Sequence, residues 1–248
     1  MPQNKTPILG VHFDVVNYDT IVEAIFTAIR KRERAWLCTV NVAILMMRRD
    51  LPSLRDFIQR ARWVVADGKP VVWISRFFGQ GLPERITGVD LIERIAERAV
   101  EERTGIFFLG AEETIGQAMI MRFQERYPGL DIRGYRNGYF TPGEAPGIAD
   151  SIAKSGAEIL IVGMGVPRQE QFISDHWDKL GISFAIPVGG SFDVLSGHRK
   201  RAPELVQKIG MEWMYRLVQE PGRLWKRYLT TNLRFLYLTS IELFRKTF

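Results

Sequence analysis

The chain has 248 residues, of which 46% are hydrophobic, so it is long enough for one sizeable α/β domain with a complete core. The net charge is +6, and residues 199–248 hold 11 Lys or Arg against 4 Asp or Glu, so the positive excess is confined to the last fifth. Such a basic block indicates a polyanionic partner, namely phosphates, nucleic acid or an anionic membrane surface. The single cysteine, Cys38, excludes an intramolecular disulfide or a cysteine metal cluster, and its apolar neighbours predict a buried thiol.

Short β-rich runs alternate along the chain with longer segments of helical period. The predicted strands, in chain order, are 8–13, 35–38, 63–66, 105–109, 131–134, 158–162 and 183–187. The predicted helices between them are 20–32, 41–50, 89–102, 114–126, 145–155 and 168–180. Several strands are uninterrupted apolar runs, as expected when helices cover both faces of a sheet. The pattern therefore predicts an α/β fold with a Rossmann-like, mainly parallel sheet sandwiched by helices.

No further strand is predicted after residue 203. Helices broken near Gly210 and at Pro221 are expected there, the last of them over residues 223–246. Its uncharged stretch, 235–241, is far below the roughly 20 residues that span a bilayer. A basic, aromatic-rich helix of this kind either lies in the membrane interface or packs on its own domain or on a neighbouring subunit. We therefore expect a catalytic core over 1–202 and a helical, basic, membrane-docking appendage over 203–248.

Polar and glycine-rich residues follow several of the predicted strands. In a parallel sheet ligands bind beyond the carboxyl ends of the strands, so these residues are the candidates for chemistry. Asp67 follows the strand 63–66, where either a catalytic carboxylate or a helix-capping turn fits. Gly163 and Gly165 follow the strand 158–162 and would let backbone N–H groups approach a phosphate or a ribose. The three histidines are far apart in the sequence and show no metal-ligand spacing.

Ordered motifs over nearly the whole chain resemble the WecG/TagA/CpsF family of glycosyltransferases. They are Thr39-Val40-Asn41, Ala66-Asp67-Gly68, Pro83-Glu84-Arg85 with Gly88 and Asp90, Gly138-Tyr139-Phe140, Gly165-Val166-Pro167-Arg168-Gln169-Glu170, Gly189-Gly190-Ser191-Phe192-Asp193, Arg201-Ala202-Pro203, and Glu212-Trp213-Met214-Tyr215-Arg216-Leu217 followed by Glu220-Pro221 and Arg223. The resemblance implies an inverting transferase without a metal or other cofactor, and no Asp-x-Asp metal motif occurs in the chain. It also implies a UDP-sugar donor, with N-acetylmannosamine or its uronic acid as first choice and UDP-glucose or another UDP-hexose as the alternative.

The acceptor implied by the resemblance is a sugar on a polyprenyl diphosphate, used in cell-surface polysaccharide synthesis. The mobile C-terminal segment would dock on the membrane and complete the active site. The expected location is therefore the cytoplasm, with the protein bound peripherally to the inner face of the cell membrane. The N-terminus agrees with this expectation because it lacks the apolar core of a secretory signal. The exposed apolar face of the last helix also makes homo-oligomer formation a possible outcome.

The resemblance assigns roles residue by residue. Asp67 is the base that takes the proton of the acceptor hydroxyl. Arg216 and Arg223 neutralise the charge that develops on UDP, as arginines do with paired donors. Substrate contacts are expected from Thr39, Asn41, Arg85, Gly163, Gly165 and Gln169; for Asn41 the alternative is helix capping, and for Arg85 it is a structural pair with Asp90.

Two other classes of protein share features with this sequence. A nicotinamide-dependent oxidoreductase needs a glycine-rich fingerprint in the first βα turn, and residues 13–17 supply none. A non-catalytic module that binds membrane or nucleic acid through its basic end explains the charge distribution. It leaves the polar residues at four strand ends without a role, so we expect an enzyme that binds no nucleic acid.

Overall fold

The protein is described by a computed structural model that covers residues 4–247, apart from the side chains of residues 223, 246 and 247. By its internal contacts the chain divides into two compact units. Unit 1 comprises residues 1–17, 39–87 and 201–248, and unit 2 comprises residues 18–38 and 88–200. The boundary that the sequence suggests between a core and an appendage, at residue 202, stays a prediction.

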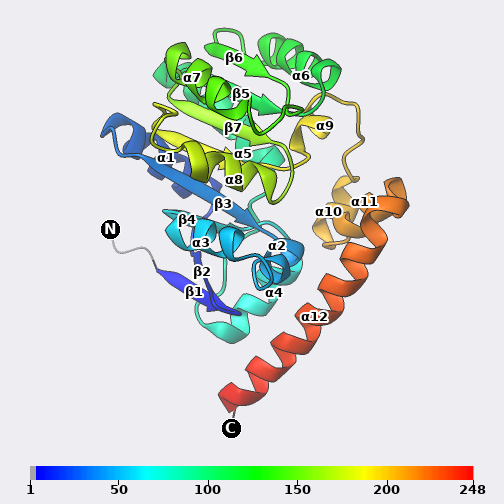
Figure 1. The fold of residues 1–248 in the computed structure, drawn as a ribbon. Helices are drawn as coiled ribbons and strands as arrows, with labels where there is room; N and C mark the ends of the chain where they lie inside the picture. Colours follow the sequence, from blue (N-terminus) through cyan, green and yellow to red (C-terminus); the bar gives the residue numbers. More distant parts are fainter. Residues whose placement is uncertain (1–3, 248) are drawn as a thin grey trace. The chain divides into compact units, whose positions relative to one another are not determined.

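A six-stranded sheet has the strand order β4-β3-β8-β7-β5-β6 (Figure 1). The pairs β3–β8, β8–β7, β7–β5 and β5–β6 are all parallel. The strands are β3 (Ala35–Val40), β4 (Trp63–Ala66), β5 (Ile106–Gly110), β6 (Ile132–Arg136), β7 (Ile159–Gly163) and β8 (Phe184–Pro187). The predicted α/β, Rossmann-like fold with a mainly parallel sheet is confirmed.

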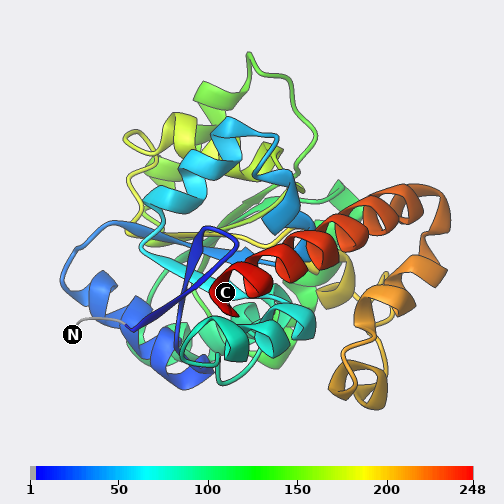
Figure 2. The same ribbon diagram turned by 90° about the horizontal axis from the view of Figure 1, so that it is seen from below.

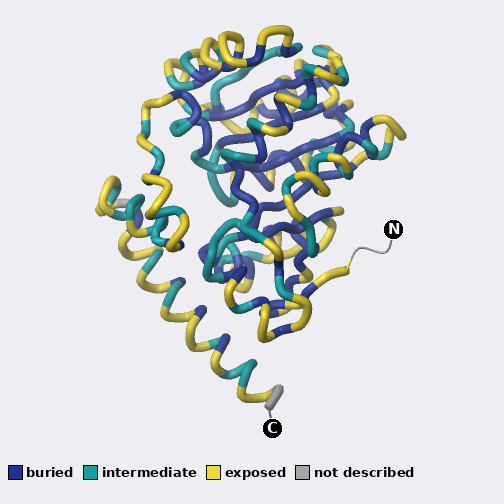
Figure 3. The backbone as a smooth tube through the Cα atoms, turned by 180° about the vertical axis from the view of Figure 1, so that it is seen from behind, coloured by how far each residue is buried: buried dark blue, intermediate teal, exposed yellow. Residues whose placement is uncertain are grey.

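Unit 2 contains β5 to β8, the first part of β3 and six helices. These are α1 (Tyr18–Arg30), α5 (Gly88–Glu102), α6 (Glu113–Arg126), α7 (Ala145–Ser155), α8 (Arg168–His176) and α9 (Ser191–Leu195). Helix α7 packs beside α8, while α1, α5, α9 and α6 contact one another in a row (Figure 1). Every residue of β5, β7 and β8 is buried, as the apolar runs predict, and these strands appear dark blue in Figure 3. Phe108 on β5 is fully buried and meets the rings of Phe123 and Phe192 edge to face.

A close helix–strand contact in unit 2 depends on Gly116 of α6. A Cβ atom at this position would lie 2.0–2.2 Å from ring atoms of Tyr135 on β6. We expect Gly116→Ala to lower the free energy of unfolding by about 1–3 kcal/mol, the usual cost of overpacking. Gly147→Ala in α7 is the matched control, because nothing lies within 4 Å of its added Cβ, and it should leave the stability equal or slightly higher. Urea unfolding measures both, and equal midpoints for the two variants would contradict the packing explanation.

The N-terminal segment of unit 1 corrects one prediction. The single strand expected over residues 8–13 is instead a hairpin of β1 (Lys5–Ile8) and β2 (Val11–Asp14), which forms a separate two-stranded antiparallel sheet. The two loop residues, Leu9 (φ 48°) and Gly10 (φ 80°), both have left-handed backbone conformations, as a tight hairpin turn requires. The hairpin contacts β4, where the buried carboxylate of Asp14 accepts a 2.8 Å hydrogen bond from the Val64 N–H.

Unit 1 also contains six helices among the described residues. They are α2 (Val42–Met47), α3 (Pro52–Arg60), α4 (Lys69–Phe78), α10 (Glu204–Lys208), α11 (Glu212–Gln219) and α12 (Pro221–Thr247). The expected helix over 41–50 is shorter than predicted, and α3 and α4 were not predicted. Both begin with a proline in the first turn, where the missing N–H costs nothing.

Helix α12 is one continuous helix of 27 residues, drawn in red in Figure 2. It packs along α2 through one side, on which Leu224, Thr231, Phe235 and Thr239 are buried (Figure 3). The sequence left open whether this helix lies in the membrane interface or packs on protein. The side of α12 that faces α2 packs on its own unit. None of the described helices is long and apolar enough to cross a membrane.

Candidate active site

Asp67 lies directly after the buried strand β4 and before the first residue of α4. Its backbone N–H donates a 3.1 Å hydrogen bond to the carbonyl of Val40 at the end of β3, which fixes the strand end. Gly68 then has a φ of 149°, and the chain turns into α4. The half-buried Asp67 is thus held by backbone contacts at the carboxyl end of its strand, where parallel sheets place their ligands.

Four polar side chains of unit 1 act on the Asp67 carboxyl group. Burial is the largest effect and raises its pKa, and the negative charge of Glu212 raises it further. The positive charges of Arg216 and Arg85 and a hydrogen bond from Asn41 act in the opposite direction. The net result is a pKa of about 6 for Asp67, well above the ordinary value of 3.8. Such a carboxylate is ionised at neutral pH and is a stronger proton acceptor than an exposed one.

The Asn41 side chain forms hydrogen bonds with two neighbours, the Ile44 backbone and the Asp67 side chain. Its side-chain oxygen accepts a 3.0 Å hydrogen bond from the Ile44 N–H and caps α2, as the capping alternative predicted. Its amide also donates to Asp67. Thr39, two residues earlier on β3, is buried with 8% exposure. The expected contacts of Thr39 and Asn41 with substrate stay predictions.

Arg85 is tied to the C-terminal helices of unit 1. Its Nη1 atom forms an ion pair with the Oε2 atom of Glu212, and its Nη2 atom donates a 2.9 Å hydrogen bond to the side-chain oxygen of Gln207. The Arg85 side chain is only 13% exposed. The partnership of Arg85 with α10 and α11 was not predicted from the sequence, although Glu212 stands in one of the family motifs.

Arg216 and Arg223 are the two cationic residues for which the family resemblance predicts catalytic roles. Arg216 lies on α11, one helical turn after Glu212, and acts on Asp67. Its buried Nε atom has no hydrogen-bond partner among the described residues. Arg223 lies in α12, but its side chain is outside the part of the chain that the structure describes.

The glycines predicted to bind substrate, Gly163 and Gly165, lie in unit 2 at the end of β7 and just after it. Gly163 is the last residue of β7, and its carbonyl accepts a 3.0 Å hydrogen bond from the Ala111 N–H, which joins the loops after β7 and β5. Gly165 (φ 79°) and Gly189 (φ 57°) both adopt left-handed conformations, and a Cβ added to either would meet no atom within 4 Å. The backbone at these two positions is therefore open on one side, as the close approach of a ligand requires.

Gln169 and Glu170, in the first turn of α8, are both buried. The Gln169 side-chain oxygen accepts a 2.9 Å hydrogen bond from the Gly189 N–H, and its amide nitrogen donates a 2.8 Å hydrogen bond to Glu170. Gln169 thus connects α8 to the loop after β8, and its expected contact with substrate stays a prediction. Burial raises the pKa of Glu170 to about 7. Cys38 is buried, as predicted, and burial raises the pKa of its thiol.

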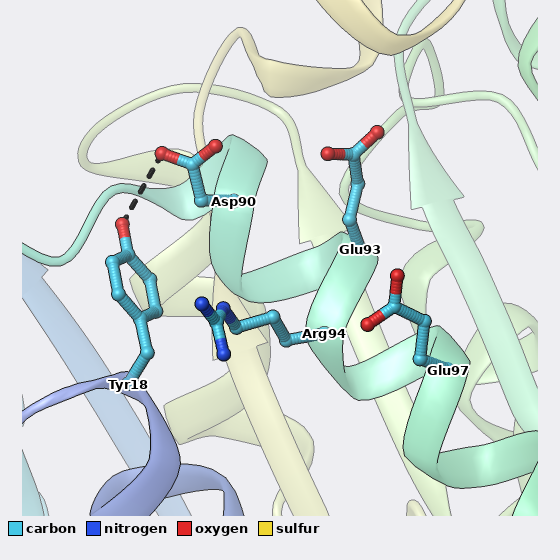
Figure 4. A pocket seen from close by; sticks show the side chains of 5 residues that line it. All are labelled: Tyr18, Asp90, Glu93, Arg94 and Glu97. Atoms are coloured by element: carbon cyan, nitrogen blue, oxygen red, sulfur yellow. Dashed lines mark hydrogen bonds between the residues drawn. The ribbon is translucent and has the colours of Figure 1, made fainter.

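An open pocket of about 320 Å³ is lined by Tyr18 of α1 and by Asp90, Glu93, Arg94 and Glu97 of α5 (Figure 4). The Tyr18 hydroxyl donates a 3.2 Å hydrogen bond to Asp90, and the Arg94 guanidinium lies 5.0 Å from the Tyr18 ring. No predicted site residue lines this pocket. Within residues 4–247, no group of three or more His, Cys, Asp or Glu side chains is arranged to hold a metal ion.

A parallel, Rossmann-like α/β sheet with a carboxylate of raised pKa at the end of a strand is the arrangement of an enzyme active site. The chain belongs to the Glycosyl transferase WecG/TagA/CpsF family, whose model matches residues 6–248, and it is therefore a glycosyltransferase. It is 34% identical over 204 residues to an N-acetylglucosaminyldiphosphoundecaprenol N-acetyl-beta-D-mannosaminyltransferase of Bacillus spizizenii, covering 82% of this chain and 78% of that protein. It is 32% identical over 214 residues to the protein of the same name in Bacillus subtilis, covering 86% of this chain and 82% of that protein.

Proposed function

We propose that this glycosyltransferase moves N-acetylmannosamine from UDP to an N-acetylglucosamine carried on a polyprenyl diphosphate. The names of two relatives that match most of the chain support the sugar and the acceptor. The observation that carries the catalytic part is the position of the Asp67 carboxylate at the carboxyl end of β4, where the positive charges of Arg216 and Arg85 act on it. The uronic acid of the same sugar, glucose and other hexoses are the alternative donors that the experiment below distinguishes.

The reaction requires one in-line displacement with inversion. The acceptor hydroxyl oxygen forms a bond to the anomeric carbon of the donor sugar, while the bond from that carbon to the β-phosphate oxygen of UDP breaks. Asp67 accepts the hydroxyl proton as the new bond forms, and UDP leaves with the electron pair. The raised pKa makes Asp67 a better acceptor for this proton, yet leaves it mostly ionised at pH 7 or above.

The developing negative charge on UDP is balanced by arginine rather than by a metal ion. Arg216 is suited to this role because its positive charge acts on the base and its buried Nε atom keeps an unpaired donor among the described residues. Arginine offers paired donors and a permanent charge to phosphate oxygens. Arg223 is proposed to act in the same way, and Gly163 and Gly165 to let the donor come close to the backbone.

The experiment that tests this function measures UDP release from a panel of UDP-sugars. The acceptor is lipid-diphosphate-linked N-acetylglucosamine in detergent, and reactions are run with and without EDTA. We expect acceptor-dependent release with UDP-N-acetylmannosamine, at a rate that EDTA does not change. Release only with UDP-glucose, or only with the UDP-linked uronic acid, would show that this sugar and not N-acetylmannosamine is transferred. A rate restored only by Mg²⁺ or Mn²⁺ would overturn the metal-free mechanism.

We also propose that α12 places the enzyme on the inner face of the cell membrane. Exposed apolar residues recur at helical spacing along the side of α12 that does not pack on α2: Trp225, Leu229, Leu233, Leu236, Tyr237 and Phe244. Basic side chains of the same helix, Arg227 and Arg245 among them, are exposed. A helix with apolar and basic exposed residues binds an anionic lipid surface in the interface plane.

Co-sedimentation with vesicles tests this placement. We expect binding to vesicles that contain anionic lipid, weakened at least about tenfold by Leu229→Glu, because a charge is forced into the apolar layer. Met121→Glu makes the same change at another exposed apolar residue, on α6, and should bind as the wild type does. If Leu229→Glu instead abolishes self-association and leaves vesicle binding intact, this face joins copies of the protein and the membrane proposal is wrong.

A further inference from the structure

Glu212 is a partly exposed side chain to which the mechanism above gives no role, although it acts on two residues of the site, Arg85 and Asp67. Its carboxylate pairs with the Arg85 guanidinium, and its side chain is 24% exposed. The negative charge of Glu212 also raises the pKa of the Asp67 carboxyl group, and only burial has a larger effect. Glu212 and Arg216 are four residues apart on α11, so the same side of one helix presents both charges to the base.

We propose that Glu212 is a positioning residue of the active site, which holds Arg85 against α11 and keeps a negative charge beside Asp67. This inference rests on the proposed function, in which Asp67 takes the acceptor proton. Glu212 itself touches no reacting atom and acts through its two neighbours.

The pairing with Glu212 decides which way Arg85 points. A guanidinium with one partner on each side has little rotational freedom, and Arg85 is held by Glu212 through Nη1 and by Gln207 through Nη2. Both partners belong to the C-terminal helices, whereas Arg85 lies in the segment between α4 and α5. The ion pair therefore fixes α11 to that segment and brings Arg216 to Asp67 at the same time.

The charge of Glu212 balances the two arginines around the base. Arg216 and Arg85 lower the pKa of Asp67, Glu212 raises it, and Asn41 lowers it through a hydrogen bond. Without Glu212, two cations would face Asp67 unopposed and make it a weaker base. A negatively charged leaving group beside Arg216 would act in the same direction as Glu212 and strengthen the base when the donor is bound.

The test compares Glu212→Gln with the wild type in two measurements on the full chain. Glutamine keeps an oxygen that accepts from Arg85 and removes only the charge. Carboxyl carbon NMR, with the Asp67 signal assigned from Asp67→Asn, follows the titration of Asp67 without any substrate. We expect the pKa of Asp67 to fall in Glu212→Gln, and the acid limb of the kcat/KM profile to move to lower pH by the same amount. Glu204→Gln, an exposed acid of α10, should change neither.

The positioning role has its own readout. Glu212→Asp keeps the charge but withdraws it from Arg85 by one methylene, so we expect KM for the donor to rise about tenfold while the Asp67 titration stays near that of the wild type. An unchanged KM in this variant overturns the positioning of Arg85. Glu212→Asp therefore keeps the positioning role testable even if Glu212→Gln does not fold.

The outcomes separate this inference from the proposed function. An Asp67 titration that is the same in Glu212→Gln and in the wild type overturns the charge role, whatever the enzyme transfers. A shifted titration without turnover of any UDP-sugar supports the electrostatic role and counts against the proposed function. A lower melting temperature with no change in titration or KM shows a purely structural ion pair.

Discussion

Replacing Asp67 by asparagine is expected to lower kcat by about 10²–10⁴-fold, the range that a general base contributes. Asparagine has nearly the same shape, so it can keep the place of Asp67 after β4 and a hydrogen bond with the Asn41 side chain. It cannot accept the proton of the acceptor hydroxyl. KM for the donor should change little, because the substitution removes the proton acceptor and no contact assigned to the donor. UDP release at saturating donor and acceptor measures the effect.

The pH profile provides a second measurement of the same role. A base must be deprotonated to act, and burial raises the pKa of Asp67 to about 6. The wild-type kcat/KM should therefore rise with pH up to about 6 and level off above it, whereas an ordinary aspartate would give a plateau from about pH 4 upward. The residual activity of Asp67→Asn should lack this limb.

Asp178→Asn is the matched control, because Asp178 is 99% exposed and is none of the candidate site residues, so its substitution should leave both the rate and the pH profile unchanged. An Asp67→Asn enzyme with more than about half of the wild-type kcat would remove Asp67 from the role of base. The family assignment would be unaffected, and the search for the proton acceptor would move to the other carboxylates of the site.

The regular part of the fold could be predicted from the sequence because it follows local rules. Apolar runs such as residues 159–162 are buried on both faces, and each became a strand of the parallel sheet. The hairpin over residues 5–14 was missed because its turn, Leu9-Gly10, lies inside an apolar run, and only the pairing of its strands reveals it. Helix α4 was missed because Asp67-Gly68 and Pro70 indicate a turn, although they also fit the start of a helix.

The candidate site could be predicted only where its residues follow strands. Asp67 was singled out because it follows a buried strand, which is a short-range feature. The partnership of Arg85 with Glu212 joins residues 127 positions apart and depends on how α10 and α11 pack. Periodicity and motif spacing carry no information on that packing. The resemblance to a family placed Glu212 in a motif but gave it no role, and the geometry supplied one.

The second large effect is expected at Arg216. Arg216→Ala should lower kcat by about 10²–10³-fold, as the loss of one preorganised donor to a developing oxyanion does. Arg216→Lys should recover only part of this, because an ammonium group does not offer the paired donors of a guanidinium. Arg216→Ala also removes a charge that lowers the pKa of Asp67, so the acid limb of the pH profile should move to higher pH in this variant. Arg216→Lys keeps a positive charge and should move the limb less.

A point substitution tests this better than deletion of the C-terminal helices. Helix α12 buries Leu224 and Phe235 and packs along α2, so a truncation after Gly210 would uncover α2, whose N-cap Asn41 contacts Asp67. A loss of activity in the truncated protein could then result either from the missing Arg216 or from a displaced Asn41.

Arg234→Ala is the control for Arg216→Ala. Arg234 belongs to the same basic block but pairs with Asp50 at the surface, so this variant should keep nearly full activity on an acceptor in detergent. If Arg216→Ala and Arg234→Ala reduce kcat equally, Arg216 has no specific role at the leaving group, and the positive charge of the segment as a whole accounts for the effect.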